Sequence, residues 1–203
     1  MHSLTKKIIS IYLLFILLST FSMELKAQTS ANDDKKAVRQ NDLPMTYEPN
    51  PAFPFGRLNP DAPPETAQFA FMIGEFDCVD EIVNPQDGKW AKFPAIWNAR
   101  YFLNGHGIQD SYWSPTFSTS NIRIYDAREK KWKVTFFRMP GNGTGLWTGV
   151  KEGGNLVMRQ GTDEKGSRLT FSKITENGFQ WTGESMTEGV AKPFWKSSCR
   201  RRR

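Results

Sequence analysis

The fold is decided by the stretch Lys131-Trp132-Lys133-Val134-Thr135-Phe136, in which polar and apolar side chains alternate one by one. Successive side chains of a β-strand point to opposite faces of a sheet, so this alternation predicts a half-buried strand. The same period of two recurs at Leu169 to Ser172 and at Phe179 to Thr182. No segment between residues 72 and 199 carries the apolar stripe of an amphipathic helix.

Turn-forming sequences rich in Gly, Pro, Asn and Asp divide this region into short segments, as at Asn84 to Gly88 and at Glu176 to Gly178. A short helical turn is expected at Pro64 to Phe69, because proline is favoured at the first position of a helix. The predicted strands cover residues 72–83, 89–103, 106–117, 119–126, 131–138, 145–151, 154–160, 167–175, 178–187 and 192–199.

These hairpin-linked strands predict an all-β fold, an antiparallel up-and-down meander. A sheet of this size removes its exposed edges most simply by closing on itself, so we expect a barrel of about 8–10 strands. A β-sandwich of two sheets is the alternative architecture.

The N-terminal sequence predicts export. Lys6 and Lys7 precede a mostly apolar run from Ile8 to Phe21, and the small residue Ala27 follows. This is the pattern of a cleavable signal peptide, whereas a retained membrane anchor needs about 20 apolar residues. We therefore expect residues 1–27 to be removed, no transmembrane segment to remain, and the mature chain to reach the periplasm or the extracellular space.

Composition divides the rest of the chain into three parts. Residues 28–64 hold seven of the twelve prolines and many polar residues, which predicts a disordered tether. Residues 65–199 form the predicted barrel domain, and residues 200–203 are a basic tail of four arginines. Without the signal peptide and this tail the basic and acidic residues balance, which argues against a nucleic-acid partner. The sequence sets no oligomeric state.

Several tracts resemble known barrel proteins. Residues 71–76, which enter the first predicted strand, resemble the opening of the calycin-type barrels, the lipocalins and their relatives, although Phe76 stands where lipocalins have tryptophan. The tracts 105–110, 118–126, 131–136 and 179–185 resemble a group of bacterial lipocalin-like proteins of unknown function, the DUF1579-like group. The resemblance implies a fold and little chemistry, because one fold hosts many functions.

Tryptophans and a few polar residues are the candidates for a ligand site. Small-molecule pockets are mostly apolar with a few placed polar groups. The candidate ligand-binding residues are Gln109, Arg123, Tyr125, Trp132, Trp181 and Glu184. In the alternative interpretation the tryptophans fill the core and Arg123 pairs with a structural carboxylate such as Asp110 or Glu184.

The sequence predicts no cofactor and no metal site. His106 is the one histidine after residue 27, and it stands between two glycines. It is a weak candidate for a haem ligand, with an ordinary turn histidine as the alternative. An acid–base enzyme using His106, Asp110 and Glu184 is a less favoured hypothesis, and no nucleophile motif occurs.

Two cysteines lie at opposite ends of the predicted barrel. Cys78 falls in the first predicted strand and Cys199 at the end of the last, and closure places those strands side by side. Export would expose both thiols to an oxidising compartment, so a disulfide across the seam between these two strands is a hypothesis, with two free thiols as the alternative.

The leading functional hypothesis is an exported barrel that binds a small apolar or amphipathic ligand, and the second is a filled barrel with a structural or interaction role.

Overall fold

The structure, a computed structural model, describes residues 45–203, and ten strands make up most of that region. The predicted signal peptide and residues 28–44 of the predicted tether lie outside the described residues. Each strand lies within four residues of its predicted position at either end. The elements are η2 (Pro64–Met72), β1 (Gly74–Val83), β2 (Trp90–Phe102), β3 (Gly107–Trp113), β4 (Ser118–Asp126), β5 (Lys131–Met139), β6 (Gly143–Glu152), β7 (Asn155–Gly161), β8 (Lys165–Thr175), β9 (Gly178–Thr187) and β10 (Val190–Arg201).

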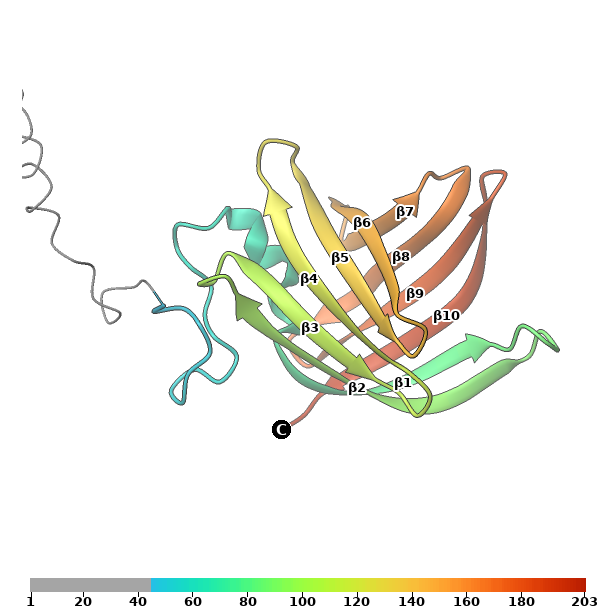
Figure 1. Cartoon of the computed structure of the whole chain (residues 1–203), viewed down its shortest axis with the longest axis horizontal. Coiled ribbons are helices and arrows are strands. Elements are labelled where there is room, and N and C mark those ends of the chain that lie inside the picture. The colour runs from blue at the N-terminus through green and yellow to red at the C-terminus, as the bar shows by residue number, and fades with distance from the viewer. Residues whose placement is uncertain (1–44) are drawn as a thin grey trace, which may run out of the picture. The chain divides into compact units, whose positions relative to one another are not determined.

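The strands form one closed barrel (Figure 1). Each strand pairs antiparallel with its neighbours in sequence, and β1 also pairs with β10, which closes the sheet. The predicted antiparallel up-and-down barrel is therefore confirmed, and the sandwich alternative is excluded. Among residues 45–203 no helix is both long and apolar enough to cross a membrane.

The alternation seen in the sequence sets the inside and the outside of the barrel. Along β1 the side chains of Phe76, Cys78 and Asp80 are buried, whereas those of Asp77 and Val79 between them are exposed. Buried side chains from η2 and eight of the strands meet in one core cluster, and the partly buried Tyr125 of β4 and Trp147 of β6 pack against it.

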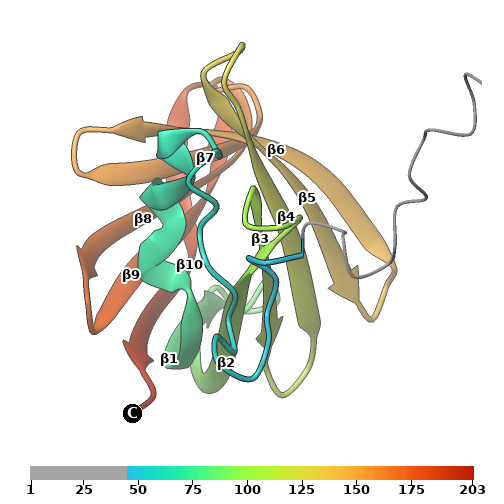
Figure 2. The same ribbon diagram turned by 90° about the vertical axis from the view of Figure 1, so that its left-hand side faces the viewer.

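The predicted helical turn is present and extends as a 3₁₀ helix to Met72. Figure 2 shows η2 at one end of the barrel. Phe69 of η2 is fully buried, and its ring packs edge-on against Trp132 at 4.8 Å and against Phe171 at 5.6 Å between centroids. Edge-on aromatic pairs of this kind add to the stabilisation from apolar burial, so η2 acts as a plug for this end.

The segment before η2 is ordered, which corrects the prediction of a disordered tether for residues 45–63. The backbone N–H of Tyr47 donates to Asn104 Oδ1 at 3.0 Å, and the N–H of Tyr101 donates to the carbonyl of Phe55 at 2.9 Å. Gly105 has a φ of +80°, and a Cβ there would overlap with the carbonyl oxygen of Arg57. The composition favours disorder, but hydrogen bonds to the end of β2 and the following turn give this segment fixed partners.

The C-terminal arginines are also part of the barrel, which corrects the prediction of a basic tail over residues 200–203. β10 continues to Arg201, because Arg200 and Arg201 pair with Asp77 and Phe76 of β1 and so satisfy that strand's backbone. The Arg201 guanidinium donates to the carbonyl of Ile73 at 2.6 Å, and Arg202 donates to Asp77 Oδ1 at 2.6 Å.

Candidate ligand cavity

The barrel interior holds a cavity of about 350 Å³ that is partly open to solvent. It lies toward the end of the barrel away from η2, since its walls include Phe117, Arg138 and Phe194, which lie near the β3–β4, β5–β6 and β9–β10 turns. Most of its wall is aromatic or aliphatic. The lining residues are Ile82, Trp97, Tyr112, Phe117, Thr119, Asn121, Arg123, Val134, Phe136, Arg138, Trp147, Met158, Arg168, Leu169, Trp181, Gly183, Phe194 and Trp195.

One wall is a continuous series of aromatic contacts. Trp97 packs edge-on against Tyr112 at 6.2 Å between ring centroids, and Tyr112 packs against Trp195 at 5.7 Å. Trp195 in turn lies 4.8 Å from Trp181. These side chains come from β2, β3, β10 and β9, so the closure of the barrel is what brings the wall together.

Behind this wall, the buried carboxylate of Asp80 accepts three hydrogen bonds. Tyr112 Oη donates to Oδ2 at 2.5 Å, Trp195 Nε1 donates to Oδ2 at 2.6 Å, and Ser197 Oγ donates to Oδ1 at 2.6 Å. Burial raises the pKa of Asp80, and the three donors oppose that rise. Burial and the adjacent carboxylate together raise the pKa of Tyr112. The network holds the polar ends of Tyr112 and Trp195, which leaves their rings as apolar wall.

A second buried charge stands at the cavity wall. Arg123, which is 4% exposed, forms an ion pair with Asp110, whose other carboxylate oxygen accepts from Asn121 Nδ2 at 2.8 Å. The Arg123 guanidinium also lies 5.2 Å from the ring centre of Phe69 and 6.0 Å from that of Trp97. Burial lowers the pKa of Arg123 to about 9, so the side chain stays charged at neutral pH and requires its carboxylate partner.

Apart from Arg123 Nη1, which is ion-paired with Asp110, three buried donors of the lining residues have no hydrogen-bond partner among the described residues. They are Nε1 of Trp97, Nε1 of Trp181 and Nε of Arg123. A buried donor without an acceptor costs about 1–3 kcal/mol, so such groups in one cavity wall are unusual for a well-packed core.

The six ligand-binding candidates do not come together in one place. Arg123 and Trp181 line the cavity. Trp132 is fully buried against η2, where its Nε1 donates to Gln68 Oε1 at 3.0 Å, and Tyr125 packs against Trp132 at 5.6 Å. These two residues therefore belong to the plugged end and not to the cavity wall.

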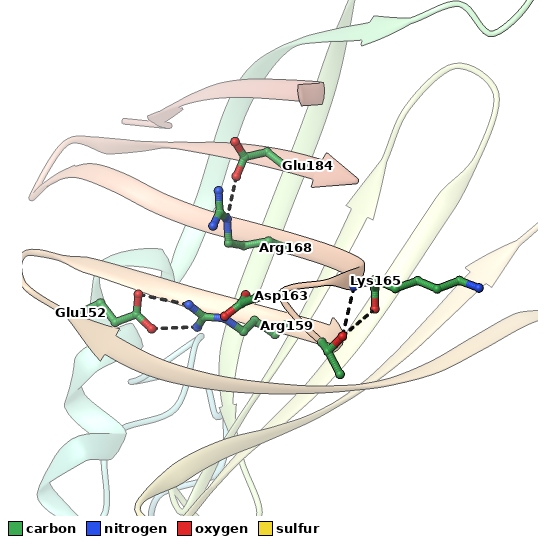
Figure 3. Close-up of polar contacts among 7 residues, drawn as sticks. Glu152, Arg159, Asp163, Lys165, Arg168 and Glu184 are labelled. Atoms are coloured by element: carbon green, nitrogen blue, oxygen red, sulfur yellow. Dashed lines mark hydrogen bonds and ion pairs between the residues drawn. The ribbon is translucent and has the colours of Figure 1, made fainter. Parts of the chain in front are cut away.

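Gln109 and Glu184 pair with arginines and do not line the cavity. Gln109 alternates with the buried residues of β3, so it faces away from the core, where its Oε1 accepts from Arg100 Nη2 at 2.9 Å. Glu184 accepts from Arg168 Nε at 2.9 Å (Figure 3). The neighbouring Arg159 is held by Glu152 and Asp163 in the same view.

His106 lies in the turn between β2 and β3, where its N–H donates to the carbonyl of Leu103 at 3.1 Å. Residues 45–59 pack on this turn, where the backbone N–H of Asn59 donates to the carbonyl of Gly105. His106 does not line the cavity. The hypothetical enzyme residues Asp110 and Glu184 do not line it either, and both are engaged by arginines. Within residues 45–203, no group of three or more His, Cys, Asp or Glu side chains is arranged to hold a metal ion.

The sequence reasoning missed the Asp80 network. Its members are separated by 32 residues between Asp80 and Tyr112 and by 117 between Asp80 and Ser197. One signal was available, because Asp80 stands in phase with the apolar positions Phe76 and Cys78 of its strand. An acidic residue at an inward position predicts a buried, hydrogen-bonded carboxylate.

The structure joins Cys78 to Cys199 by a disulfide, with the two residues directly opposite in the β1–β10 register. Within residues 45–203 no free cysteine remains. Asp80, Ser197 and Trp195 connect the same two strands, so the seam carries both a covalent and a hydrogen-bonded link.

Comparison with known proteins shows similarity to solved structures in fold only. No family model matches the chain, and no curated protein matches it. Rv2717c from M. tuberculosis is similar in structure with a TM-score of 0.52 and 9% identity, over 70% of this chain and all of that one. The likeness concerns the fold, a closed antiparallel barrel.

The S-type phycobiliprotein lyase CpeS from Guillardia theta also matches, with a TM-score of 0.44 and 14% identity over 67% of this chain and 91% of that one. At these identities the comparisons concern the fold alone. Membership of the DUF1579-like group is not shown, since no family model matches.

Proposed function

We propose that this barrel binds a small apolar or amphipathic molecule in its cavity. The observation that carries the proposal is the cavity itself, whose volume of about 350 Å³ lies within the range of roughly 300–1,000 Å³ typical of small-molecule sites. Its wall combines aromatic rings with a few polar groups, which is the usual composition of such sites. A purely structural barrel would gain stability by filling this space with side chains.

Filling the cavity is expected to abolish binding. Leu169 lines the cavity, so Leu169→Trp places a larger side chain in it. Fatty acids, retinoids, haem and flavins should be screened by quenching of tryptophan fluorescence, and at least one is expected to bind the unmodified protein. We expect Leu169→Trp to weaken that binding at least tenfold, because the ligand and the indole would occupy the same volume.

The matched control is Leu146→Trp, which makes the same substitution at a side chain that is 74% exposed. This variant should bind as the unmodified protein does. If no compound on the panel binds, or if both variants bind equally well, the proposed function is wrong.

We further propose that the domain acts outside the cytoplasm. The pattern of Lys6, Lys7 and the apolar run to Phe21 supports export, and the seam disulfide requires an oxidising compartment to form and persist. Expression of the full chain in a bacterial host should yield a periplasmic or secreted product whose first residue is Gln28. Intact-mass and N-terminal analysis would establish this, and an uncleaved product in the cytoplasm would refute it.

A further inference from the structure

The unpartnered polar atoms at the cavity wall are all donors. Trp97, Trp181 and Arg123 are each 4% exposed. Nε1 of each tryptophan and Nε of Arg123 are buried without a hydrogen-bond partner among the described residues, whereas Arg123 Nη1 is ion-paired with Asp110. The Arg123 guanidinium lies 6.0 Å from the ring centre of Trp97. Trp181 joins the same wall through Trp195 and Tyr112.

The other hydrogen-bond donors of this aromatic wall have acceptors within the protein. Tyr112 and Trp195 line the same cavity, but Tyr112 Oη and Trp195 Nε1 both donate to Asp80. The protein therefore supplies an acceptor for some donors of this wall and not for Trp97 and Trp181. Buried donors are normally satisfied, so the absence of an acceptor indicates that the occupant of the cavity brings one.

The charges around the cavity favour an anionic acceptor. Three arginines line it, namely Arg123, Arg138 and Arg168, and no carboxylate does. Asp110 and Glu184 neutralise two of them from behind the wall, and Arg138 forms no ion pair within residues 45–203. The lining thus keeps an excess of positive charge.

We propose that the ligand is an amphiphile with a carboxylate head, whose oxygens accept hydrogen bonds from Trp97 Nε1, Trp181 Nε1 and Arg123 Nε, and whose apolar body packs on the aromatic wall. This inference rests on the proposed function, since it requires a ligand in the cavity. A carboxylate is an acceptor only, so it matches a set of donors without placing any donor of its own against them.

The test compares two single-chain amphiphiles of equal length, dodecanoate and dodecylammonium. Each displaces the neutral fluorophore N-phenyl-1-naphthylamine from the purified mature protein. We expect dodecanoate to bind at least tenfold more tightly than dodecylammonium. Trp97→Phe and Trp181→Phe remove one N–H each while keeping an aromatic ring, and each is expected to weaken dodecanoate binding about tenfold. Neither should change the affinity for the neutral fluorophore by more than about twofold, which also shows that the variants are folded.

The matched control is Trp113→Phe. It makes the same change at an indole that is 47% exposed and does not line the cavity. This variant should bind dodecanoate within about twofold of the unmodified protein. Equal affinity for the two amphiphiles, or equal losses in all three variants, would overturn the carboxylate assignment while leaving the ligand-binding function intact. Failure of the fluorophore and both amphiphiles to bind would overturn both proposals.

Discussion

The double variant Cys78→Ala/Cys199→Ala is expected to lose about 4–5 kcal/mol of unfolding free energy relative to the oxidised protein. The two cysteines are 121 residues apart, and a cross-link over that separation removes much of the conformational freedom of the unfolded chain. Both side chains are small and buried, so their replacement by alanine adds only a minor loss of packing. The expected loss is therefore a property of the covalent link.

Urea unfolding with and without a reductant measures this effect. Reduction should move the midpoint of the unmodified protein toward that of the double variant, and it should leave the double variant unchanged. An unmodified protein whose midpoint does not respond to reductant would show that the bridge contributes no stability.

Asp80→Ala is expected to destabilise the fold by about 2–4 kcal/mol. It removes the shared acceptor of Tyr112, Trp195 and Ser197, and a buried donor left without an acceptor costs about 1–3 kcal/mol. Asp80→Asn should be milder, because an amide oxygen still accepts from Tyr112 and Trp195, while the amide N–H₂ donates to the Ser197 hydroxyl. Equilibrium unfolding of the two variants should therefore rank alanine as the more damaging.

The same pair of proteins tests the ionisation of Asp80. The pKa of Asp80 is higher in the folded protein than in the unfolded chain, because burial disfavours the ionised carboxylate. The folded state therefore takes up the proton at a higher pH than the unfolded state does. As the pH falls through the raised pKa toward the ordinary value of an aspartate, the unmodified protein should gain stability relative to Asp80→Asn. Unfolding free energies measured for both proteins across the acid range give this difference. A difference that is constant or changes in the opposite sense would contradict the raised pKa.

The strands could be predicted from the sequence because their signals are local. The alternation at residues 131–136 and the turns rich in glycine and asparagine depend only on neighbouring residues, and the ten strands follow them closely. The end of β3 is an exception, since the strand stops at Trp113 and Ser114 to Phe117 form a hydrogen-bonded turn.

The ligand site depended on information that local patterns do not carry. Trp132 and Trp181 both stand in segments where apolar and polar residues alternate, so the sequence does not distinguish them. They differ in their position along the barrel axis, because Trp132 contacts η2 and Trp181 lines the cavity. The order in residues 45–63 likewise arises from contacts with a turn more than 40 residues away. Amino-acid composition indicates only whether a segment would be disordered in isolation. In residues 45–63, hydrogen bonds to the barrel outweigh the tendency to disorder.

The pairing of β1 with β10 has a consequence for how the molecule assembles. Every other neighbouring pair in the barrel is joined by a short hairpin, whereas these two strands lie at opposite ends of the domain sequence. Non-local contacts bear the largest loop-closure entropy, so we expect the hairpin-linked strands to pair before β1 pairs with β10. Until then both outer strands present unpaired backbone to other molecules, which is the condition for intermolecular strand exchange and aggregation. The disulfide between Cys78 and Cys199 then opposes reopening of this pair of strands, so an oxidised barrel is less available for pairing with other chains.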